Sequence, residues 1–321
     1  MEYLRDPGPN SDLPRGGVVT IGNFDGVHRG HRSILEAAVS RARELEVPSV
    51  VLTFYPHPEK ALRPESELRL LSTRTQRAQL IERLGVDSLV EIGFDRRFAA
   101  ISAMAFVRDF VHRRLAPREV WLGSNFRFGS NREGDLDLLS VQGRELEFGV
   151  LGVPAVMDGN EPISSTRVRR EVARGHVVEA WRLLGRPFFV DGKVAVGFRM
   201  GRRLGFPTIN IEVENELMPA HGVYVTGVHI PSFGRIFHSV TNIGVRPTVY
   251  QRSTVVVECH VLDFTADVYR EDVRLFFFQR LRDERVFGSS MELVAQIRRD
   301  VEAARLYFLQ ADLAENELVR R

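Results

Sequence analysis

The chain has 321 residues, 44% of them hydrophobic and 27% charged, which is typical of globular proteins and excludes disordered, collagenous and coiled-coil proteins. Lys and Arg number 44 against 42 Asp and Glu, so the net charge of +2 is too small to drive nucleic-acid binding over a whole surface. The single cysteine, Cys259, excludes a disulfide framework and any zinc or iron–sulfur site built from several cysteines.

The length predicts two domains, each large enough to bury its own core. No run approaches the roughly 20 apolar residues of a membrane span, and the N-terminal residues lack the basic start and apolar stretch of a signal peptide. We therefore expect a cytoplasmic protein without a membrane partner. Only Lys60 and Lys193 are lysines, and we interpret the excess of arginine mainly as a composition bias.

The first half of the chain alternates strand and helix patterns. Residues 18–21 form an apolar run that ends at Gly22, apolar residues then recur at helical spacing up to Leu45, and residues 50–54 form a second apolar run. This order predicts a βαβ unit. Further helical and strand patterns alternate at residues 73–84, 88–92, 103–115 and 119–122. The alternation predicts a doubly wound parallel sheet.

The pattern changes near Gly185. Residues 166–184 are predicted to form one helix. Gly185 and Pro187 directly after this segment are typical of a helix end. Short β-branched and aromatic runs predict a small antiparallel β-barrel, at residues 188–196, 222–229, 236–241, 255–262 and 273–278. A last amphipathic helix is predicted over residues 290–309. The fold class is thus α/β followed by β, with domains over residues 1–184 and 185–321.

A glycine- and histidine-rich segment, residues 22–31, follows the first predicted strand, where open α/β sheets bind ligands. Its glycines, Gly22, Gly26 and Gly30, allow a phosphate to approach the backbone closely, and the following helix presents unpaired N–H groups. His28 and His31 lie three residues apart, so both side chains can donate to one group of phosphate oxygens. A shared metal ion and two solvated histidines are the alternatives, and no nearby Cys or Glu completes a zinc site.

A second segment with phosphate-binding character is Ser164-Ser165-Thr166, just before the helix predicted over residues 166–184. Hydroxyl and backbone N–H groups at a helix start face an anion bound there, although the same residues also serve as simple N-caps. Arg169 on the first turn would add a bidentate phosphate contact.

A third segment combines a loop rich in Gly and Arg, which includes Gly201, Arg202 and Gly205, with the sequence Pro207-Thr208-Ile209-Asn210. There is no GxxxxGK[ST] motif, so a P-loop is excluded. Strand alternation places Thr208 and Asn210 on one side, where their oxygens are suitable ligands for Mg²⁺. The alternative is an ordinary glycine hairpin that leads into an edge strand.

Residues 22–31 resemble the GxFDxxHxGH motif of the HxGH nucleotidyltransferases, and more narrowly that of the bifunctional prokaryotic riboflavin kinase/FAD synthetase family. Gly205–Asn210 resembles the GFPTAN signature of riboflavin kinases, with Ile209 in place of Ala. Other segments agree with the same family: residues 53–58, 123–129, 163–169, 222–224, 242–248, 258–264 and 281–287. The resemblance covers nearly the whole chain in matching order.

The resemblance implies an HxGH nucleotidyltransferase-like N-terminal domain and a riboflavin kinase barrel. The barrel would phosphorylate riboflavin to FMN with ATP, and the first domain would transfer AMP from ATP to FMN, giving FAD and pyrophosphate. Mg²⁺ would serve both halves by neutralising phosphate charge. The partners are then the small molecules ATP, riboflavin and FMN, with no nucleic acid, while the oligomeric state stays open.

The resemblance also implies roles in the first half. His28 and His31 would stabilise charge at the ATP α-phosphate, and Ser164, Ser165, Thr166 and Arg169 would hold the departing pyrophosphate. Phe24 and Asp25 belong to the same nucleotide-binding loop, and Asn125 would contact ATP although many relatives have Asp there. His57 would lie near the flavin in this cleft, or else cap a turn.

In the second half, the resemblance makes Glu258 the general base for the riboflavin 5′-hydroxyl, against the alternative of a solvated strand carboxylate. Arg282 would contact flavin or stabilise the barrel. Two residues depart from the family pattern: Arg270 replaces a usual Gly, and Met200 replaces a common Arg. We expect Cys259 and residues 276–278 to be core rather than site residues.

Two other functions compete with the enzyme. A flavin- or nucleotide-binding regulator would have lost one activity, whereas the motif residues of both halves are present. An RNA-binding protein would need a basic stripe with interleaved aromatic residues, and the sequence shows neither.

Overall fold

The computed structural model describes residues 1–8, 10–195, 204–246 and 254–311. The chain divides into two compact units. The first unit comprises Met1–Arg69 and Arg74–Ser165, and the second comprises Leu70–Thr73 and Thr166–Arg321. Each unit has its own sheet system.

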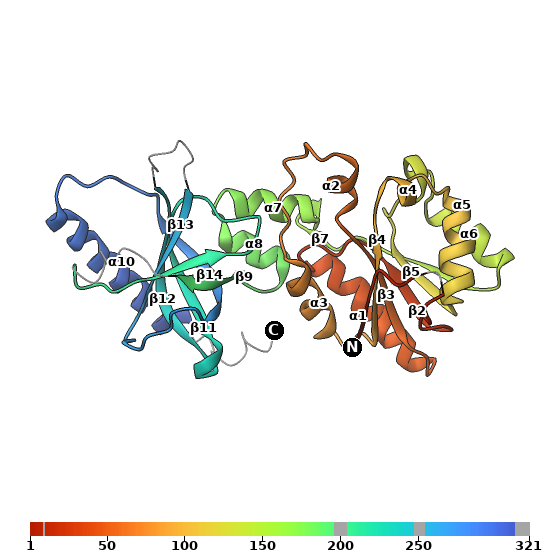
Figure 1. Ribbon diagram of the computed structural model, residues 1–321, viewed down its shortest axis with the longest axis horizontal. Coiled ribbons are helices and arrows are strands. Elements are labelled where there is room, and N and C mark those ends of the chain that lie inside the picture. Colours follow the sequence, from red (N-terminus) through yellow and green to blue (C-terminus); the bar gives the residue numbers. More distant parts are fainter. Residues whose placement is uncertain (9, 196–203, 247–253, 312–321) are drawn as a thin grey trace. The chain divides into compact units, whose positions relative to one another are not determined.

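The first unit is built on a parallel sheet of six strands in the order β1-β4-β3-β2-β5-β6 (Figure 1). The strands are β1 (Glu2–Arg5), β2 (Val18–Ile21), β3 (Ser49–Tyr55), β4 (Ser88–Gly93), β5 (Glu119–Gly123) and β6 (Gly149–Val153). The chain adds β3 and β4 on one side of β2, then β5 and β6 on the other. The carboxyl ends of β2 and β5 therefore mark the switch point at which ligands bind in open α/β sheets.

Helices cover both faces of this sheet, as a doubly wound fold requires. They are α1 (Arg29–Glu44), α2 (Pro58–Leu62), α3 (Arg74–Glu82), α4 (Arg96–Ala99), α5 (Ala103–Ala105), the π-helix η1 (Phe106–Leu115), the 3₁₀ turn η2 (Ser130–Arg132) and α6 (Leu136–Glu145). Ala38 and Ala42 of α1 pack on Val18. A larger core joins the strands to Phe106 and Leu139 from η1 and α6. A two-stranded ladder, β7 (Met157–Asp158) with β8 (Glu161–Pro162), completes the described elements.

The single helix expected over residues 166–184 is wrong. The structure has two helices, α7 (Ser165–Ala173) and α8 (Val177–Leu184). Gly175 between them has a φ of 77°, a left-handed conformation that ends a right-handed helix and that glycine adopts without a steric penalty. A Cβ at this position would also lie 2.7 Å from the Tyr224 hydroxyl. Helix α8 packs on β9 and β14 of the second unit.

The second unit contains a closed antiparallel barrel in the order β10-β13-β12-β11-β14-β9. Its elements are β9 (Phe188–Ala195), β10 (Ile209–Val213), β11 (Gly222–Ile230), the 3₁₀ turn η3 (Pro231–Phe233), β12 (Arg235–Arg246), β13 (Thr254–Val261), β14 (Asp272–Arg282) and the terminal helix α10 (Ser290–Ala311). The predicted barrel and last helix are confirmed. Cys259 and Phe277 are completely buried, as expected of core residues, and burial raises the pKa of the Cys259 thiol.

Candidate active sites

The loop after β2 has an unusual backbone. Phe24 and Val27 have positive φ angles of 50° and 39°, and Gly26 between them has a φ of 76°. Left-handed conformations cost about 1 kcal/mol or more for residues other than glycine. The loop is held in this shape by a hydrogen bond from Val27 N to Phe24 O (3.1 Å) and by burial of the Phe24 ring, which is 2% exposed. The loop therefore delivers His28 to the start of α1 in one defined position.

The two histidines of this loop form a stacked pair. His28 is the N-cap of α1, and its Nδ1 accepts a hydrogen bond from the backbone N of His31 at 3.3 Å. Because Nδ1 is the acceptor, the proton of a neutral His28 ring lies on Nε2, the atom that would donate to a phosphate. The ring centroids of His28 and His31 are 3.6 Å apart, and the ring edge of Phe24 contacts His31 at 5.3 Å. The structure thus brings the two predicted residues together.

Ser165 connects the second predicted phosphate-binding segment to the same loop. Its hydroxyl donates to the carbonyl of Asp25 at 3.0 Å, and Asp25 is itself buried. Helix α7 begins at Ser165, the last residue of the first unit, so this hydroxyl contact places the start of the helix next to the segment 22–31. Thr166 and Arg169 continue α7 in the second unit, and their phosphate contacts stay predictions.

Two further predicted residues lie at the carboxyl edge of the parallel sheet. Asn125 is exposed in the loop after β5, the neighbour of β2. His57 follows β3 and caps α2, since its Nδ1 accepts from the backbone N of Glu59 at 3.3 Å. This hydrogen bond supports the capping alternative for His57, and its role near the flavin stays a prediction.

In the barrel, three polar side chains stand in one row across adjacent strands. Glu258 on β13 pairs in register with Asn210 on β10 and with Asn242 on β12. Directly paired residues point to the same face of an antiparallel sheet. The next residues along two of these strands, Cys259 and Ile243, are completely buried in the barrel, so the row lies on its outer face. Asn242 was not predicted as a site residue, because its partner depends on strand register.

His260 is a second residue that the sequence analysis did not predict as part of the site. It lies two positions after Glu258 on β13 and therefore on the same outer face. Its Nδ1–H donates to the carbonyl of Pro207 at 2.7 Å, and its ring contacts Phe206 edge-on. These contacts fix the segment directly before the predicted metal ligand Thr208.

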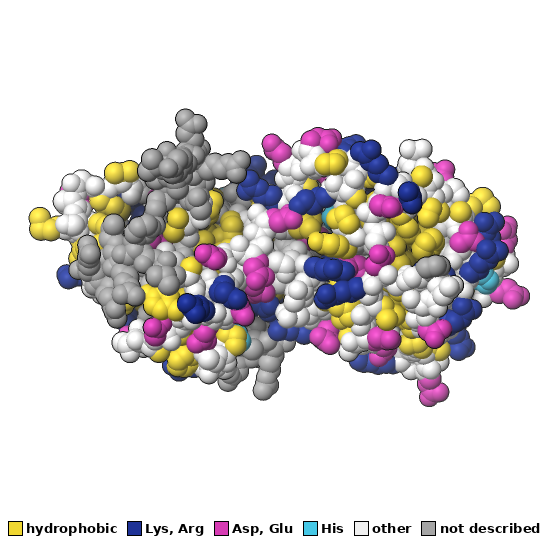
Figure 2. Space-filling model, viewed as in Figure 1, with side chains coloured by type: hydrophobic (Ala, Val, Ile, Leu, Met, Phe, Trp, Pro, Cys, Tyr) yellow, Lys and Arg dark blue, Asp and Glu magenta, His cyan; other side chains and the backbone are white. Residues whose placement is uncertain are grey.

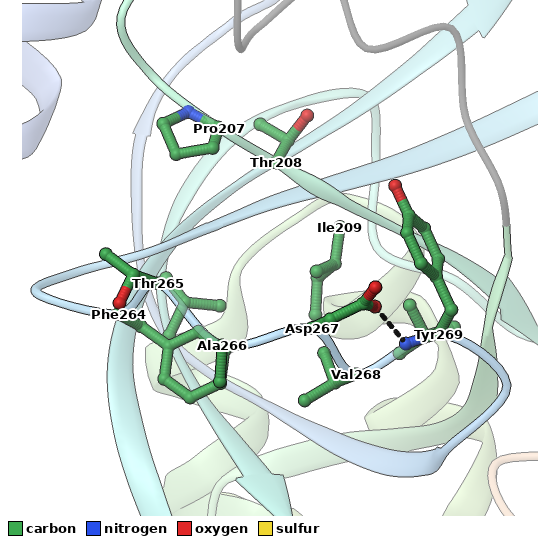
Figure 3. A pocket seen from close by; sticks show the side chains of 11 residues that line it. Pro207, Thr208, Ile209, Phe264, Thr265, Ala266, Asp267, Val268 and Tyr269 are labelled. Carbon is green, nitrogen blue, oxygen red and sulfur yellow. Dashed lines mark hydrogen bonds between the residues drawn. The ribbon is translucent and has the colours of Figure 1, made fainter.

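A cavity of about 240 Å³ adjoins this segment (Figure 3). Its lining includes Thr208 and a loop over residues 264–269, where the Asp267 carboxylate accepts a hydrogen bond from Tyr269 N at 3.0 Å. The next residue, Arg270, has a φ of 68°, which explains in physical terms why a glycine suits this position. The predicted metal ligand thus lies at the wall of a cavity on the barrel.

Arg282 forms an ion pair with α10. Its Nε and Nη2 donate to the Asp300 carboxylate at 3.1 and 2.8 Å, and Asp300 is 5% exposed. Gln296 donates to the same carboxylate, and the Arg282 guanidinium also lies 5.7 Å from the Phe287 ring centroid. These contacts support the barrel-stabilising alternative for Arg282, and a flavin contact stays a prediction.

Comparison with known proteins gives both halves a family. The FAD synthetase family matches residues 10–167, and the riboflavin kinase family matches residues 184–308. The bifunctional riboflavin kinase/FMN adenylyltransferase of Escherichia coli K12 is 36% identical over 96% of this chain and 98% of its own. Its Pseudomonas fluorescens counterpart is 40% identical over 91% and 93%. This chain belongs to the bifunctional riboflavin kinase/FMN adenylyltransferase family.

A solved structure has the same fold as this family member. It is a crystal structure described as a macrolide-efflux protein from Streptococcus pneumoniae. It is 30% identical, with a TM-score of 0.88 over 95% of this chain and 99% of that one.

No helix in the described part of this chain is long and apolar enough to cross a membrane. Figure 2 shows basic side chains interspersed with acidic ones on the face in view.

The residues predicted to bind phosphate in the barrel belong only partly to the described residues. Gly201 and Arg202 lie outside the described residues, as does Met200. Gly205 is described, and its φ of 83° shows that a glycine is needed where the loop turns toward Thr208. Among the described residues, no group of three or more His, Cys, Asp and Glu side chains is placed to hold a metal ion.

Proposed function

We propose that this chain converts riboflavin to FAD in two ATP-dependent steps. Residues 185–321 phosphorylate riboflavin to FMN, and residues 1–184 transfer AMP from a second ATP to FMN and release pyrophosphate. The observation that carries the proposal is the assembly of both candidate sites: the stacked pair His28 and His31 in one half, and the row of Asn210, Glu258 and Asn242 in the other.

In the adenylyl transfer, a phosphate oxygen of FMN attacks the α-phosphorus of ATP, and the bond from that phosphorus to the pyrophosphate breaks. Negative charge develops on the α-phosphate oxygens, and preorganised donors stabilise it most effectively. His28 and His31 act as these donors, together with the N-terminus of α1. Ser164, Ser165, Thr166 and Arg169 hold the leaving pyrophosphate.

In the kinase reaction, the Glu258 carboxylate accepts the proton of the riboflavin 5′-hydroxyl. The oxygen then attacks the γ-phosphorus of ATP, and ADP leaves. A base is useful because an alcohol is a weak nucleophile, and placement of the reactants supplies much of the remaining rate. Asn210 and Asn242 flank Glu258 in register on the two neighbouring strands.

Thr208 and Asn210 fit Mg²⁺ because each offers a hard, neutral oxygen. Mg²⁺ is commonly held by one or two protein ligands, water and substrate phosphates rather than by a complete cage of carboxylates. When bound, Mg²⁺ neutralises charge on the ATP phosphates.

The direct test uses purified protein, riboflavin, ATP and Mg²⁺, with flavins separated by chromatography. FMN is expected first and FAD later, and EDTA should stop both steps until excess Mg²⁺ is added. A protein that forms neither flavin contradicts the proposal. A protein that completes one step and never the other supports a regulator that has lost one activity.

Gly30→Ala is expected to weaken adenylation. A Cβ at Gly30 would lie 3.2 Å from the His28 ring, so the ring must move by a few tenths of an ångström. This displacement opposes the gain of about 0.4–1 kcal/mol that alanine gives at a compatible helix position. We expect a loss of roughly tenfold in adenylation, because small misplacements of reacting groups are costly.

The control for this variant is Ser40→Ala, an exposed position on the same helix. Thermal unfolding and FMN adenylation should be measured for both variants. Ser40→Ala should keep the parent's adenylation rate. An unchanged rate in Gly30→Ala would contradict the importance of the His28 ring position.

A further inference from the structure

A buried arginine lies behind the histidine loop. Arg77 on α3 is 6% exposed. Its Nη1 donates to the carbonyl of Asn23 at 3.1 Å, while its Nη2 donates to the carbonyl of Phe54 at 3.4 Å and to the carboxylate of Glu91 at 2.7 Å. Asn23 follows β2, Phe54 lies near the end of β3, and Glu91 is on β4. One guanidinium therefore ties together the carboxyl ends of two strands and a carboxylate on the third.

Glu91 is itself held from several sides. It is 1% exposed, and its carboxylate also accepts hydrogen bonds from Arg74 Nε at 2.6 Å and from the Tyr3 hydroxyl at 3.1 Å. Burial, and then the Glu91 charge, raise the pKa of Tyr3, so the hydroxyl keeps its proton and donates. A buried charge is tolerated only when it is paired and hydrogen-bonded. The ion pair with Glu91 therefore holds the Arg77 guanidinium in a fixed position beside the loop.

Arg77 contacts the loop after β2 through its hydrogen bond to the carbonyl of Asn23. The next residue, Phe24, has the left-handed φ of 50°, so the orientation of the Asn23–Phe24 peptide decides the course of the loop. Asn23 O accepts a second hydrogen bond from the Thr53 hydroxyl at 3.4 Å. The Asn23 carbonyl is part-buried, so the loss of its donors costs up to the roughly 1–3 kcal/mol of a fully buried carbonyl, which is comparable with the strain of the left-handed residues. The two donors therefore oppose relaxation of the loop.

We propose that Arg77 is a positioning residue for FMN adenylation: it holds the Asn23 carbonyl, and through the loop after β2 it places His28 and His31. The proposal rests on the function proposed for the first half of the chain. An arginine suits this role better than a lysine, because a planar fork can donate to two carbonyls and a carboxylate at once, whereas a lysine presents a compact point charge.

The test compares Arg77→Met and Arg77→Lys with the parent in steady-state adenylation of added FMN. Arg77→Met is expected to lower kcat on the order of 10–100-fold with little change in KM for ATP and FMN, since a small displacement of a catalytic group has effects of this size. Arg77→Lys should recover part of the loss. Riboflavin phosphorylation by the same samples should stay within about twofold of the parent and so report that the barrel is intact, while thermal unfolding reports the folding of the first unit.

Arg41→Met is the matched control. Arg41 of the same unit also forms an ion pair, with Glu119, at 2.9 Å from Nη2 and 3.1 Å from Nε. It is more exposed than Arg77, and it joins α1 to β5 rather than to the histidine loop. Both methionine variants should lower the unfolding temperature. Only Arg77→Met should lower kcat, and equal kcat values in the two variants would overturn the proposal.

Thr53→Val provides a second test, because Thr53 and Arg77 donate to the same carbonyl. If both act through Asn23 O, each donor partly replaces the other, so the double variant should lose clearly more activity than the product of the two single losses. Full additivity would mean that Arg77 acts by another route and would overturn the proposal.

Hydrogen exchange at Val27 N separates this proposal from the proposed function, since it needs no turnover. This amide donates to Phe24 O within the loop, and its protection should fall in Arg77→Met but not in Arg41→Met. Unchanged protection would count against positioning by Arg77. Absence of adenylation in the parent protein, with the protection change present, would count against the proposed function alone.

Discussion

Replacing His28 by asparagine and His31 by alanine in one protein is expected to lower FMN adenylation by at least about 10³-fold. Loss of a single preorganised donor to a developing negative charge commonly costs about 10²–10³ in kcat. Asparagine is chosen at position 28 because His28 caps α1, and Asn is among the best N-cap residues. The variant therefore removes the imidazoles and keeps a capping side chain.

Adenylation is measured as conversion of added FMN to FAD, and riboflavin phosphorylation is measured in the same samples. The kinase rate should be unchanged, because the site proposed for that reaction lies in the barrel. His112→Ala in the last turn of η1 serves as the control for loss of a histidine from the first unit. A double variant that keeps a tenth of the parent's adenylation rate would refute the assigned role.

The converse variant is Glu258→Gln, which should lower FMN formation by about 10²–10⁴-fold, the usual contribution of a general base. Glutamine keeps the size of the side chain and its place between Asn210 and Asn242, but it cannot accept the 5′-hydroxyl proton. Added FMN should still be converted to FAD at the parent rate.

Glu212→Gln is the matched control for this variant, since Glu212 is an exposed carboxylate two residues after Asn210 on β10. It should leave both activities unchanged. Parent-like FMN formation by Glu258→Gln would leave Glu258 as a solvated strand carboxylate. Mixing the histidine variant with Glu258→Gln should restore FAD synthesis from riboflavin if FMN is released between the steps.

The sequence predicted elements whose pattern carries strong local information. The apolar run before Gly22 is confirmed as β2. The barrel strands rich in β-branched residues are confirmed as β9 and β11–β14. By contrast β1 was missed, since its four residues include charges at both ends and it pairs only with β4 at the sheet edge. β6 was missed because two of its five residues are glycines, which weaken a strand pattern.

The candidate sites divide in the same way. His28 and His31 are three residues apart in one segment, so their proximity follows from helix geometry. The positions of Asn242 and His260 beside Glu258 and Pro207 depend on strand register and on a loop, which a single sequence does not specify. Arg77 lies in a helix rich in charged residues, where an arginine normally indicates a solvated face. Its burial is a tertiary effect.

Strand pairing in the two halves also determines how early each half can fold during synthesis. Strand β9 hydrogen-bonds to β14, although about 80 residues separate them in the chain, so the barrel cannot close until Arg282 has left the ribosome. The parallel sheet needs nothing beyond β6 and can form much earlier. The half proposed to make FAD is therefore complete while the half proposed to supply its FMN is still being translated.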